Sequence, residues 1–387
     1  MENFIDIYHR SLNKAGEELC GDQVRIIKTP DKTTIVLSDG LSSGVKASIL
    51  ATLTTDIIAT MVREDTDLRE VLSTVIRTLP VDQERRIAYA TFTILTIDHK
   101  DNQFRLVNFD NPEPFYLKNG SIRRLNMRVN KILGKKLFFA DGSFELNDFI
   151  GLVSDGILYA GLGTTMNFGW GWENVAKYME QEVFRRKVFA AHSVVNSVVS
   201  VTNQLYHFSP GDDATFVGVL ARKRNSLMIL SGPPIDDGHD YIYVDKLLDF
   251  NGRKAICGGT TANIVAGFLK AKVETELSTM RPDIPAIGRL PGIDLVTEGI
   301  LTLAATLDLL QQSEGSLDKL QLDNNGAYLL TREMLAADAI HFLVGQSINP
   351  FYQNPLLPKN ISIRRYLIER IAEVLDQYNK DVNIELC

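Results

Sequence analysis

Four aspartates beside glycines are the residues of this chain best suited to chemistry. Short apolar runs flank them, as in IVLSDG, GLVSDG and DDATFVGV. The set is Asp22, Asp39, Asp155 and Asp212, with Asp213 directly after the last. Carboxylates at strand ends can converge at one edge of a sheet, and neighbouring glycines let backbone carbonyls approach a metal. We therefore expect these side chains to form one acidic site.

The chemistry of such a site follows from its ligands. Mg²⁺ and Mn²⁺ prefer oxygen ligands, several of them water. A set without histidine or cysteine does not fit structural zinc. Two such ions about 3.5–4 Å apart can share a bridging water, lower its pKa and hold a phosphoryl group for in-line attack. The aspartates thus predict hydrolysis of a phosphate ester by a metal-activated water, without a covalent enzyme intermediate.

A plainer interpretation competes with this one. Asp-Gly is among the commonest turn dipeptides, so any single one of these positions is better explained as a turn. The pair Asp212-Asp213 alone would also suit a solvated loop. The ordered series of positions, and no single member, favours a site.

The elements that must position the aspartates alternate between strands and helices. Apolar and β-branched runs predict strands at residues 33–38, 89–98, 104–109, 114–118, 144–146, 148–154 and 214–221. Longer periodic runs predict helices at residues 45–62, 68–79, 174–180 and 190–206. Ser42 and Ser43 are expected to cap the first of these helices. Asn119-Gly120 indicates a hairpin.

Over about residues 15–220 this pattern resembles the metal-dependent protein phosphatases of the 2C class. It is most similar to their bacterial branch, which includes the sporulation stage II phosphatase (SpoIIE). The matching motifs are Gly21-Asp22, the run from Ser38-Asp39-Gly40 to Gly44, residues 108–115, Ser154-Asp155-Gly156, and Asp212-Asp213-Ala214-Thr215. No single motif is specific, but their order and spacing together are.

The resemblance implies a fold and a set of roles. The fold is α+β, a β-sandwich flanked by antiparallel helices. The catalytic Asp39 would bridge two divalent cations, Mn²⁺ or Mg²⁺, with the carbonyl of Gly40 on one of them. The remaining metal ligands would be Asp22, Asp155 and Asp212. Asp213 is the fallback for Asp212, because the family ligand occupies the first position of D-[DN]-x-T.

The chain departs from the family pattern in several places. Ser42 replaces a frequent glycine, residues 108–111 replace a more usual A-x-x-G-H stretch, and Ala214 replaces a common methionine. None of these changes removes a proposed ligand. The arginine that grips phosphate in eukaryotic relatives has no secure counterpart. Its candidates Arg10, Lys14 and Lys46 are each better explained as solvated surface charges.

Two glycine-rich segments admit more than one interpretation. Residues 163–173 contain Trp170 and Trp172, and suit either a flap that contacts substrate or a loop anchored by a buried tryptophan. Residues 257–261, CGGTT, link a predicted strand to a predicted helix, whose first N–H groups could bind an anion. This segment has neither a P-loop lysine nor GxGxxG, so a glycine turn with a threonine cap is favoured.

The polar segment 222–225, RKRN, predicts a boundary between a phosphatase domain at 1–222 and a smaller domain at 226–387. Strands and helices alternate in the second domain, which predicts an α/β layer structure. Glu298-Gly299 repeats the carboxylate-glycine pattern there, but stands alone. Dimerisation, partner docking and sensing remain open as its roles, and a homodimer is one arrangement it allows.

Bulk properties exclude several classes of protein. The 387 residues have a formal net charge of -7 and no basic run, so nucleic acid is not an expected partner. Three scattered cysteines predict no disulfide framework. We expect no signal peptide and no membrane span, because no uncharged apolar stretch reaches about eighteen residues. A cytoplasmic location follows from these expectations.

The sequence therefore predicts a serine/threonine phosphoprotein phosphatase that acts on a bacterial regulatory protein. An anti-sigma-factor antagonist, or a similar partner-switching component, is the substrate that the resemblance implies. Two alternatives stay open. One is a binding or scaffold module that keeps the fold without catalysis, and the other is a hydrolase of small phosphate esters.

Overall fold

The computed structural model divides the chain into two compact units, Met1–Lys223 and Arg224–Cys387. The division lies within the polar segment 222–225. The structure describes residues 4–41, 43–78, 90–185, 190–234, 238, 240–347, 363–378 and 380–387. The sheets and hydrophobic cores of the two units are separate, and each unit is described by itself.

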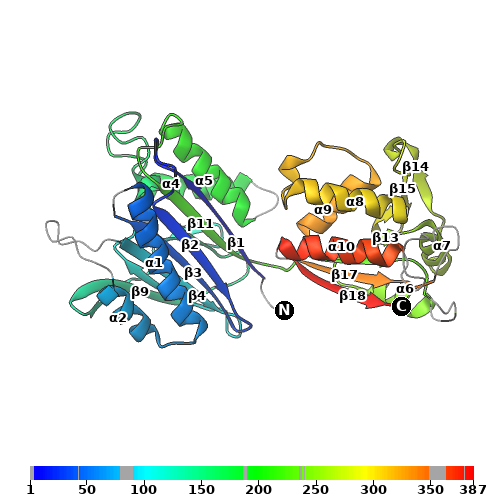
Figure 1. Cartoon of the computed structure of the whole chain (residues 1–387), viewed down its shortest axis with the longest axis horizontal. Coiled ribbons are helices and arrows are strands. Elements are labelled where there is room, and N and C mark those ends of the chain that lie inside the picture. The colour runs from blue at the N-terminus through cyan, green and yellow to red at the C-terminus, as the bar shows by residue number, and fades with distance from the viewer. Residues whose placement is uncertain are drawn as a thin grey trace. The chain divides into compact units, whose positions relative to one another are not determined.

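Two antiparallel sheets form the centre of the first unit (Figure 1). One sheet has the strand order β1-β11-β10-β6-β7 and the other β2-β3-β4-β5-β9-β8. The first comprises β1 (Phe4–Leu12), β6 (Phe115–Lys118), β7 (Ser121–Arg123), β10 (Phe149–Val153) and β11 (Ala214–Arg222). The second comprises β2 (Asp22–Lys28), β3 (Lys32–Gly40), β4 (Ala90–Asp98), β5 (Gln103–Phe109), β8 (Arg128–Ile132) and β9 (Lys135–Ser143).

The central strands of this unit are apolar on both faces. In β3, Ile35 and Leu37 pack between the two sheets, whereas Val36 belongs to a core on the opposite face. In β11, Val217 packs between the two sheets, whereas Phe216 belongs to a core on the opposite face. Because successive side chains point to opposite faces, a continuous apolar strand needs a covering layer on each side. Three cores therefore hold this unit together.

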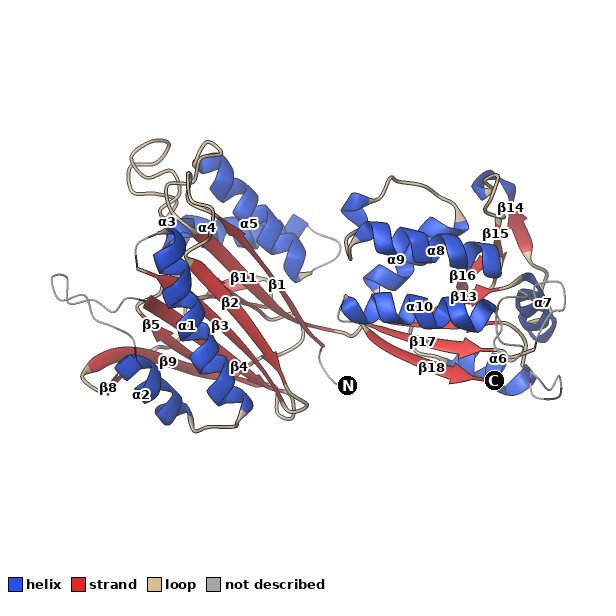
Figure 2. Ribbon diagram, viewed as in Figure 1, coloured by secondary structure: helices blue, strands red, loops and turns tan. Residues whose placement is uncertain are grey.

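Helices supply the outer layers (Figure 2). The helices α1 (Gly44–Arg63) and α2 (Leu68–Thr78) cover the sheet that contains β3, and α4 (Trp172–Arg185) and α5 (Ala191–Leu205) cover the sheet that contains β11. The short α3 (Asp155–Leu158) follows β10. The unit is thus a four-layer helix–sheet–sheet–helix sandwich, which confirms the predicted fold.

Helix α1 is the one described helix that is long and apolar enough, by length and composition, to cross a membrane. A core helix passes the same test, and α1 buries Ala47, Ala51, Ile58 and other residues against the sheet. Its exposed face is nevertheless apolar at Val45, Ile49 and Leu53.

Local patterns predicted the helices better than the strands. The prediction of a strand at residues 144–146 is wrong, because these residues belong to the turn between β9 and β10. Phe144 is apolar because it fills the core between the sheets, and Asn147 turns the chain with a φ of 69°. Strands β1, β2, β7, β8 and β9 of this unit were not predicted. The predicted cap Ser42 and the ends of the segments 68–79 and 89–98 lie outside the described residues.

A single seven-stranded sheet forms the centre of the second unit, with the order β14-β15-β16-β13-β12-β17-β18. Its strands are β12 (Ser226–Ser231), β13 (Arg253–Cys257), β14 (Glu274–Glu276), β15 (Ile287–Leu290), β16 (Ile293–Thr297), β17 (Ala339–Val344) and β18 (Asp381–Leu386). The five strands from β16 to β18 in this order are mutually parallel, and β14 and β15 extend the sheet antiparallel.

Helices cover both faces of this sheet. The cores place α6 (Asp240–Asp249) and α7 (Gly259–Phe268) on one face, and α8 (Ile300–Ser313), α9 (Gly326–Ala336) and α10 (Ile363–Gln377) on the other. The chain runs from the central β12 outward through β13 and β16, then crosses over to β17 and β18. The second unit is therefore a doubly wound α/β domain whose winding reverses between β12 and β17.

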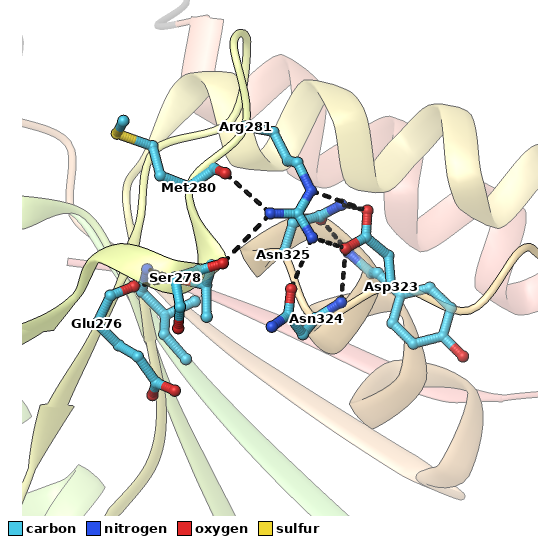
Figure 3. Close-up of polar contacts among 10 residues, drawn as sticks. Glu276, Ser278, Met280, Arg281, Asp323, Asn324 and Asn325 are labelled. Carbon is cyan, nitrogen blue, oxygen red and sulfur yellow. Dashed lines mark hydrogen bonds and ion pairs between the residues drawn. The ribbon is translucent and has the colours of Figure 1, made fainter.

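The side chain of Arg281 connects the segment after β14 with the start of α9 through hydrogen bonds (Figure 3). The guanidinium of Arg281 bonds Asp323 and donates to the Asn324 side chain at 2.7 Å. It also donates to the carbonyls of Ser278 and Met280. Asp323 in turn accepts from Asn325, whose side chain caps α9. This network links residues 42 positions apart in the chain.

Candidate metal centre

The sandwich brings the predicted aspartates together from both sheets. Asp22 and Asp39 lie directly opposite each other on β2 and β3. Asp155 begins α3 at the end of β10, and Asp212 precedes β11, the neighbour of β10. The two sheets meet here, because the Ser154 hydroxyl donates to Asp22 Oδ2 at 2.7 Å. The same hydroxyl accepts from the Thr215 N–H at 2.8 Å.

Asp213, the fallback ligand, is buried among backbone atoms of the same edge. Its Oδ1 accepts from the Lys14 N–H at 3.0 Å. A methyl group on Gly21 would lie 2.8 Å from its Oδ2, and one on Gly156 would lie 2.1 Å from its carbonyl oxygen. The glycines beside Asp22 and Asp155 are thus required by the close approach of Asp213. Asp212 points further out, with 43% of its side chain exposed.

Gly40 joins Asp39 to the first helix. A methyl group at Gly40 would lie 2.1 Å from the carbonyl oxygen of Ala47 in α1. The Gly40 N–H donates to the Gly21 carbonyl at 3.2 Å, and the Thr91 hydroxyl donates to the Asp39 carbonyl at 3.4 Å. The backbone at Asp39 and Gly40 is consequently held from three directions.

The carboxylates raise one another's pKa. Burial, and then the charges of the other four aspartates of the edge, raise the pKa of Asp39 well above its ordinary value. Burial is also the main cause of the raised pKa of Asp22. Burial and the charge of Asp212 raise the pKa of Asp155 to about 6. These shifts indicate that the folded protein places negative charge where it is poorly solvated.

Two carboxylate oxygens at this edge have no hydrogen-bond partner among the residues that the structure describes. Asp22 Oδ1 and Asp213 Oδ2 are both buried, in residues that are 4% and 5% exposed. An unpaired buried carboxylate oxygen is costly, and a cation satisfies it. In the described part of the chain, the only ion pair made by the five aspartates joins Lys14 Nζ and Asp212 Oδ1, at 4.0 Å. The donor set therefore fits a hard divalent cation.

The described residues nevertheless include no group of three or more His, Cys, Asp or Glu side chains in ready ligand geometry around a common point. Mg²⁺ usually keeps several waters and binds through one or two carboxylates, so direct convergence of all ligands is not required. The edge is in place as predicted, whereas the individual assignments of Asp22, Asp39, Gly40, Asp155 and Asp212 as ligands stay predictions.

The other predicted site residues lie in different environments. Lys14 borders the acidic edge, whereas Arg10 donates to Asn196 at 3.3 Å and Lys46 is exposed. Both tryptophans anchor their loop: Trp170 is buried, and Trp172 stacks on Phe115. The Trp172 Nε1 also donates to the Glu113 carbonyl at 2.9 Å.

Sequence reasoning missed the polar residues that support the aspartates. Ser154 links Asp22 to β11, and Thr91 bonds both the Asp39 carbonyl and the Asn111 side chain. The supporting serine could have been found in the sequence, since both SDG motifs begin with a serine. Ser38, the serine of the first motif, is also buried, and its hydroxyl donates to the Thr91 carbonyl at 2.7 Å. Thr91 has no such signal, because only strand pairing sets it opposite Asp39.

A four-layer sandwich with aspartates gathered at one edge defines the class of metal-dependent phosphatases of the 2C type. The family model of stage II sporulation protein E (SpoIIE) matches residues 29–222, and the chain belongs to this family. No curated protein sequence matches the chain.

Solved structures resemble it at low sequence identity. One is the phosphatase domain of SpoIIE from Bacillus subtilis with a fragment of its regulatory domain (15% identity, TM-score 0.49, 57% of this chain and 63% of that one). The RsbU and RsbW domains of a Mycobacterium tuberculosis protein also match (15%, 0.48, 64% and 69%). So does RsbX in complex with magnesium (18%, 0.42, 57% and 96%). This chain thus spans less than two thirds of the first structure.

Proposed function

We propose that this protein is a serine/threonine phosphoprotein phosphatase that removes phosphate from a bacterial regulatory protein. The observation that supports this proposal best is the acidic edge, where Asp22 and Asp39 lie opposite each other and buried carboxylate oxygens are unpartnered. Membership of the SpoIIE family supports the reaction type. A phosphorylated anti-sigma-factor antagonist, or a related partner-switching protein, is the substrate class we propose, and the cytoplasm the location.

The positions of these residues suggest a separate role for each of them. Asp39, held through its own carbonyl and through Gly40, would keep its carboxylate fixed while the substrate exchanges. Ser154 would orient Asp22 through its hydrogen bond. Asp155 and Asp212 would complete a site for two divalent cations, Mn²⁺ or Mg²⁺. When bound, such ions lower the pKa of a water and neutralise phosphoryl oxygens.

The acidic edge also has a consequence for substrate binding. A phosphate dianion is repelled by five neighbouring aspartates unless cations are present, and Lys14 is the one basic residue paired with them in the described part of the chain. We therefore expect phosphate affinity to depend on divalent metal, with Lys14 as a minor contribution.

Hydrolysis of p-nitrophenyl phosphate, with and without Mn²⁺, tests the proposal. We expect metal-dependent turnover in the native chain and a loss of about 100-fold or more in Asp39→Asn, since the metal clamp is lost. Asp98→Asn is the matched control, because Asp98 ends β4 at the opposite end of the same sheet. A phosphoserine peptide panel, set against nucleotides and sugar phosphates, then separates a protein phosphatase from a hydrolase of small esters.

Two results would contradict the proposal. Absence of turnover, together with absence of Mn²⁺ binding in calorimetry, would establish the alternative of a binding or scaffold module with a phosphatase fold. Equal activity in Asp39→Asn and the native chain would place the reaction elsewhere in the molecule.

A further inference from the structure

A hollow of about 430 Å³ lies beside the acidic edge of the first unit. Its lining comes from two segments, the loop after α3 at residues 159–164 and the connection from α5 to β11 at residues 206–212. Asp212, a predicted metal ligand, belongs to this lining. A polypeptide whose phosphate lies at the acidic edge therefore passes the opening of the hollow.

The lining of the hollow is mainly apolar, although the hollow is open to solvent. Tyr159 and Leu162 both line it, and they are 50% and 53% exposed. Phe208, next in the chain to the lining residue His207, is exposed as well. Large apolar side chains that stay exposed around a concave surface are typical of a binding site.

The side chain of Tyr206 forms a wall that is tied to the predicted metal ligands. Its hydroxyl donates to the carbonyl of Gly156, the residue after Asp155, at 2.8 Å. A methyl group on Gly211, the residue before Asp212, would lie 3.4 Å from the Tyr206 ring. The ring therefore keeps a fixed position relative to the backbone on both sides of the acidic edge.

The loop after α3 forms a second wall, and it is hydrogen-bonded within itself. The Leu162 N–H donates to the Tyr159 carbonyl at 3.0 Å. The Gly163 N–H donates to the Met166 carbonyl, and the Met166 N–H donates to the Gly161 carbonyl, both at 3.0 Å. These bonds order the exposed apolar side chains before any ligand arrives, which lowers the entropy cost of binding.

The turn between α5 and the hollow has an unusual backbone. His207 and Phe208 have φ values of 52° and 61°, so two successive residues with side chains adopt the left-handed conformation. This conformation is costly for residues other than glycine, because the Cβ atom crowds the backbone. Backbone strain of this kind gathers at functional sites. Here it sets His207 into the lining and leaves Phe208 exposed beside it.

We propose that the hollow binds an apolar side chain of the phosphoprotein substrate, an inference that rests on the proposed function. Asp212 borders both the hollow and the acidic edge, and an extended residue spans about 3.3 Å, so this side chain belongs within about two residues of the phosphorylated one. Leucine or phenylalanine suits the apolar lining best. An acidic side chain is repelled by Asp212, and a basic one meets a carboxylate that already pairs with Lys14.

A panel of phosphoserine peptides, assayed with the full chain and Mn²⁺, tests this inference. Each peptide carries one leucine, placed at one of the two positions before or the two positions after the phosphoserine, and alanine at the others. The measured quantity is the ratio of kcat/KM between each leucine peptide and the all-alanine peptide. We expect a ratio of about 10 or more at one position, because an apolar pocket discriminates by about 10-fold or more for added methylene groups.

Variants of the lining connect this preference to the hollow. Leu162→Ala should lower the ratio to about 3 or less, because it removes apolar surface from the lining. Tyr159→Ala should also lower it, and it serves where Leu162→Ala does not fold. Each ratio compares two peptides on one enzyme, so a general loss of activity does not change it.

Leu146→Ala is the matched control, because Leu146 is also an exposed leucine. It lies in the turn between β9 and β10, where the Asn147 N–H donates to the Ala221 carbonyl. Ala221 belongs to the end of β11 that is distant from Asp212. This variant should keep the native ratio.

Activity on p-nitrophenyl phosphate separates failure of this inference from failure of the proposed function. Metal-dependent turnover of that ester, with equal or absent activity on all the peptides, would overturn the inference alone. A leucine preference that persists unchanged in Leu162→Ala and Tyr159→Ala would also overturn it, because the preference would then arise elsewhere. Absence of turnover with every phosphate ester would overturn both.

Discussion

The two units place opposite charges at the ends of their central strands. In the first unit, five aspartates crowd an edge where one lysine is the only described ion-pair partner. In the second unit, a guanidinium and uncapped helix N–H groups occupy the edge. The first edge therefore gathers carboxylates, whereas the second gathers one arginine, Arg364, and the first N–H groups of one helix, α7.

The difference follows from how each sheet is built. Antiparallel neighbours present alternating strand ends along one edge, so the charge there must come from side chains. Parallel strands present all their carboxyl ends along one edge, where the connecting helices begin with positive dipole ends. An acidic edge is thus visible in the sequence as repeated aspartates, whereas the positive helix ends along a parallel edge follow from the path of the backbone.

The largest contrast is expected between two glycines at strand–helix junctions. Gly40→Ala forces a methyl group against the Ala47 carbonyl, so either Asp39 or α1 must shift. Because misplacement of a catalytic group by about 1 Å can cost 100-fold, we expect phosphatase activity to fall about that far. Gly259→Ala, which meets open space, should leave activity within about 2-fold.

Steady-state kinetics with p-nitrophenyl phosphate and Mn²⁺ measures both variants. Circular dichroism of Gly40→Ala tests whether the unit still folds. Full activity in Gly40→Ala would show that the junction with α1 does not hold Asp39 in place.

A smaller effect is expected from the serine that supports Asp22. Ser154→Ala removes the donor to Asp22 and the acceptor for the Thr215 N–H, both buried. Loss of a residue that orients a metal ligand typically weakens metal affinity 10–100-fold, so we expect a loss of about 10-fold for Mn²⁺. Calorimetry measures it, with Ser73→Ala as the control, since Ser73 bonds only its own helix on the surface. Unchanged Mn²⁺ affinity in Ser154→Ala would show that Ser154 does not orient a metal ligand.

The smallest effect concerns the stability of the second unit alone. Arg281→Ala removes bonds to Asp323, Asn324 and two carbonyls, and we expect a loss of about 1–2 kcal/mol in unfolding free energy. Arg289→Ala, which removes one exposed ion pair with Glu276, should cost about 0.5 kcal/mol or less.

Denaturation followed by far-UV circular dichroism measures this loss. Trp170 and Trp172 are the only tryptophans of the chain, and both lie in the first unit, so their fluorescence is an internal reference that should not move. An equal shift of the fluorescence transition would show that the two units unfold together.

Sequence reasoning succeeded where the pattern is local. The helix predicted at residues 45–62 is α1, because an apolar run of that length needs no partner to be visible. The aspartates were visible because SDG occurs twice and because Asp22 and Asp212 each follow a glycine. The sandwich itself was inferred from the resemblance, and the layers of the second unit from the alternation of its elements.

It failed where structure depends on distant partners. The run FIDIYHRSL, with its charged and polar members, became β1 only because β11 pairs with it, some two hundred residues later. The mixed sequence DVNIEL became β18 through pairing with β17. Arg364 is one of two arginines in a row at the start of a helix, and only the fold sets it against Gly232.

The pairing of β1 with β11 has a consequence for synthesis of the chain. Phe4 lies opposite Arg222, so the first strand of this unit pairs with its last strand. That sheet can close only after the whole unit has emerged, because such a non-local pairing cannot form earlier. A fragment that begins at residue 29, where the family match begins, lacks β1 and Asp22 and leaves β11 with an open edge. Fragments for study should therefore begin before Phe4.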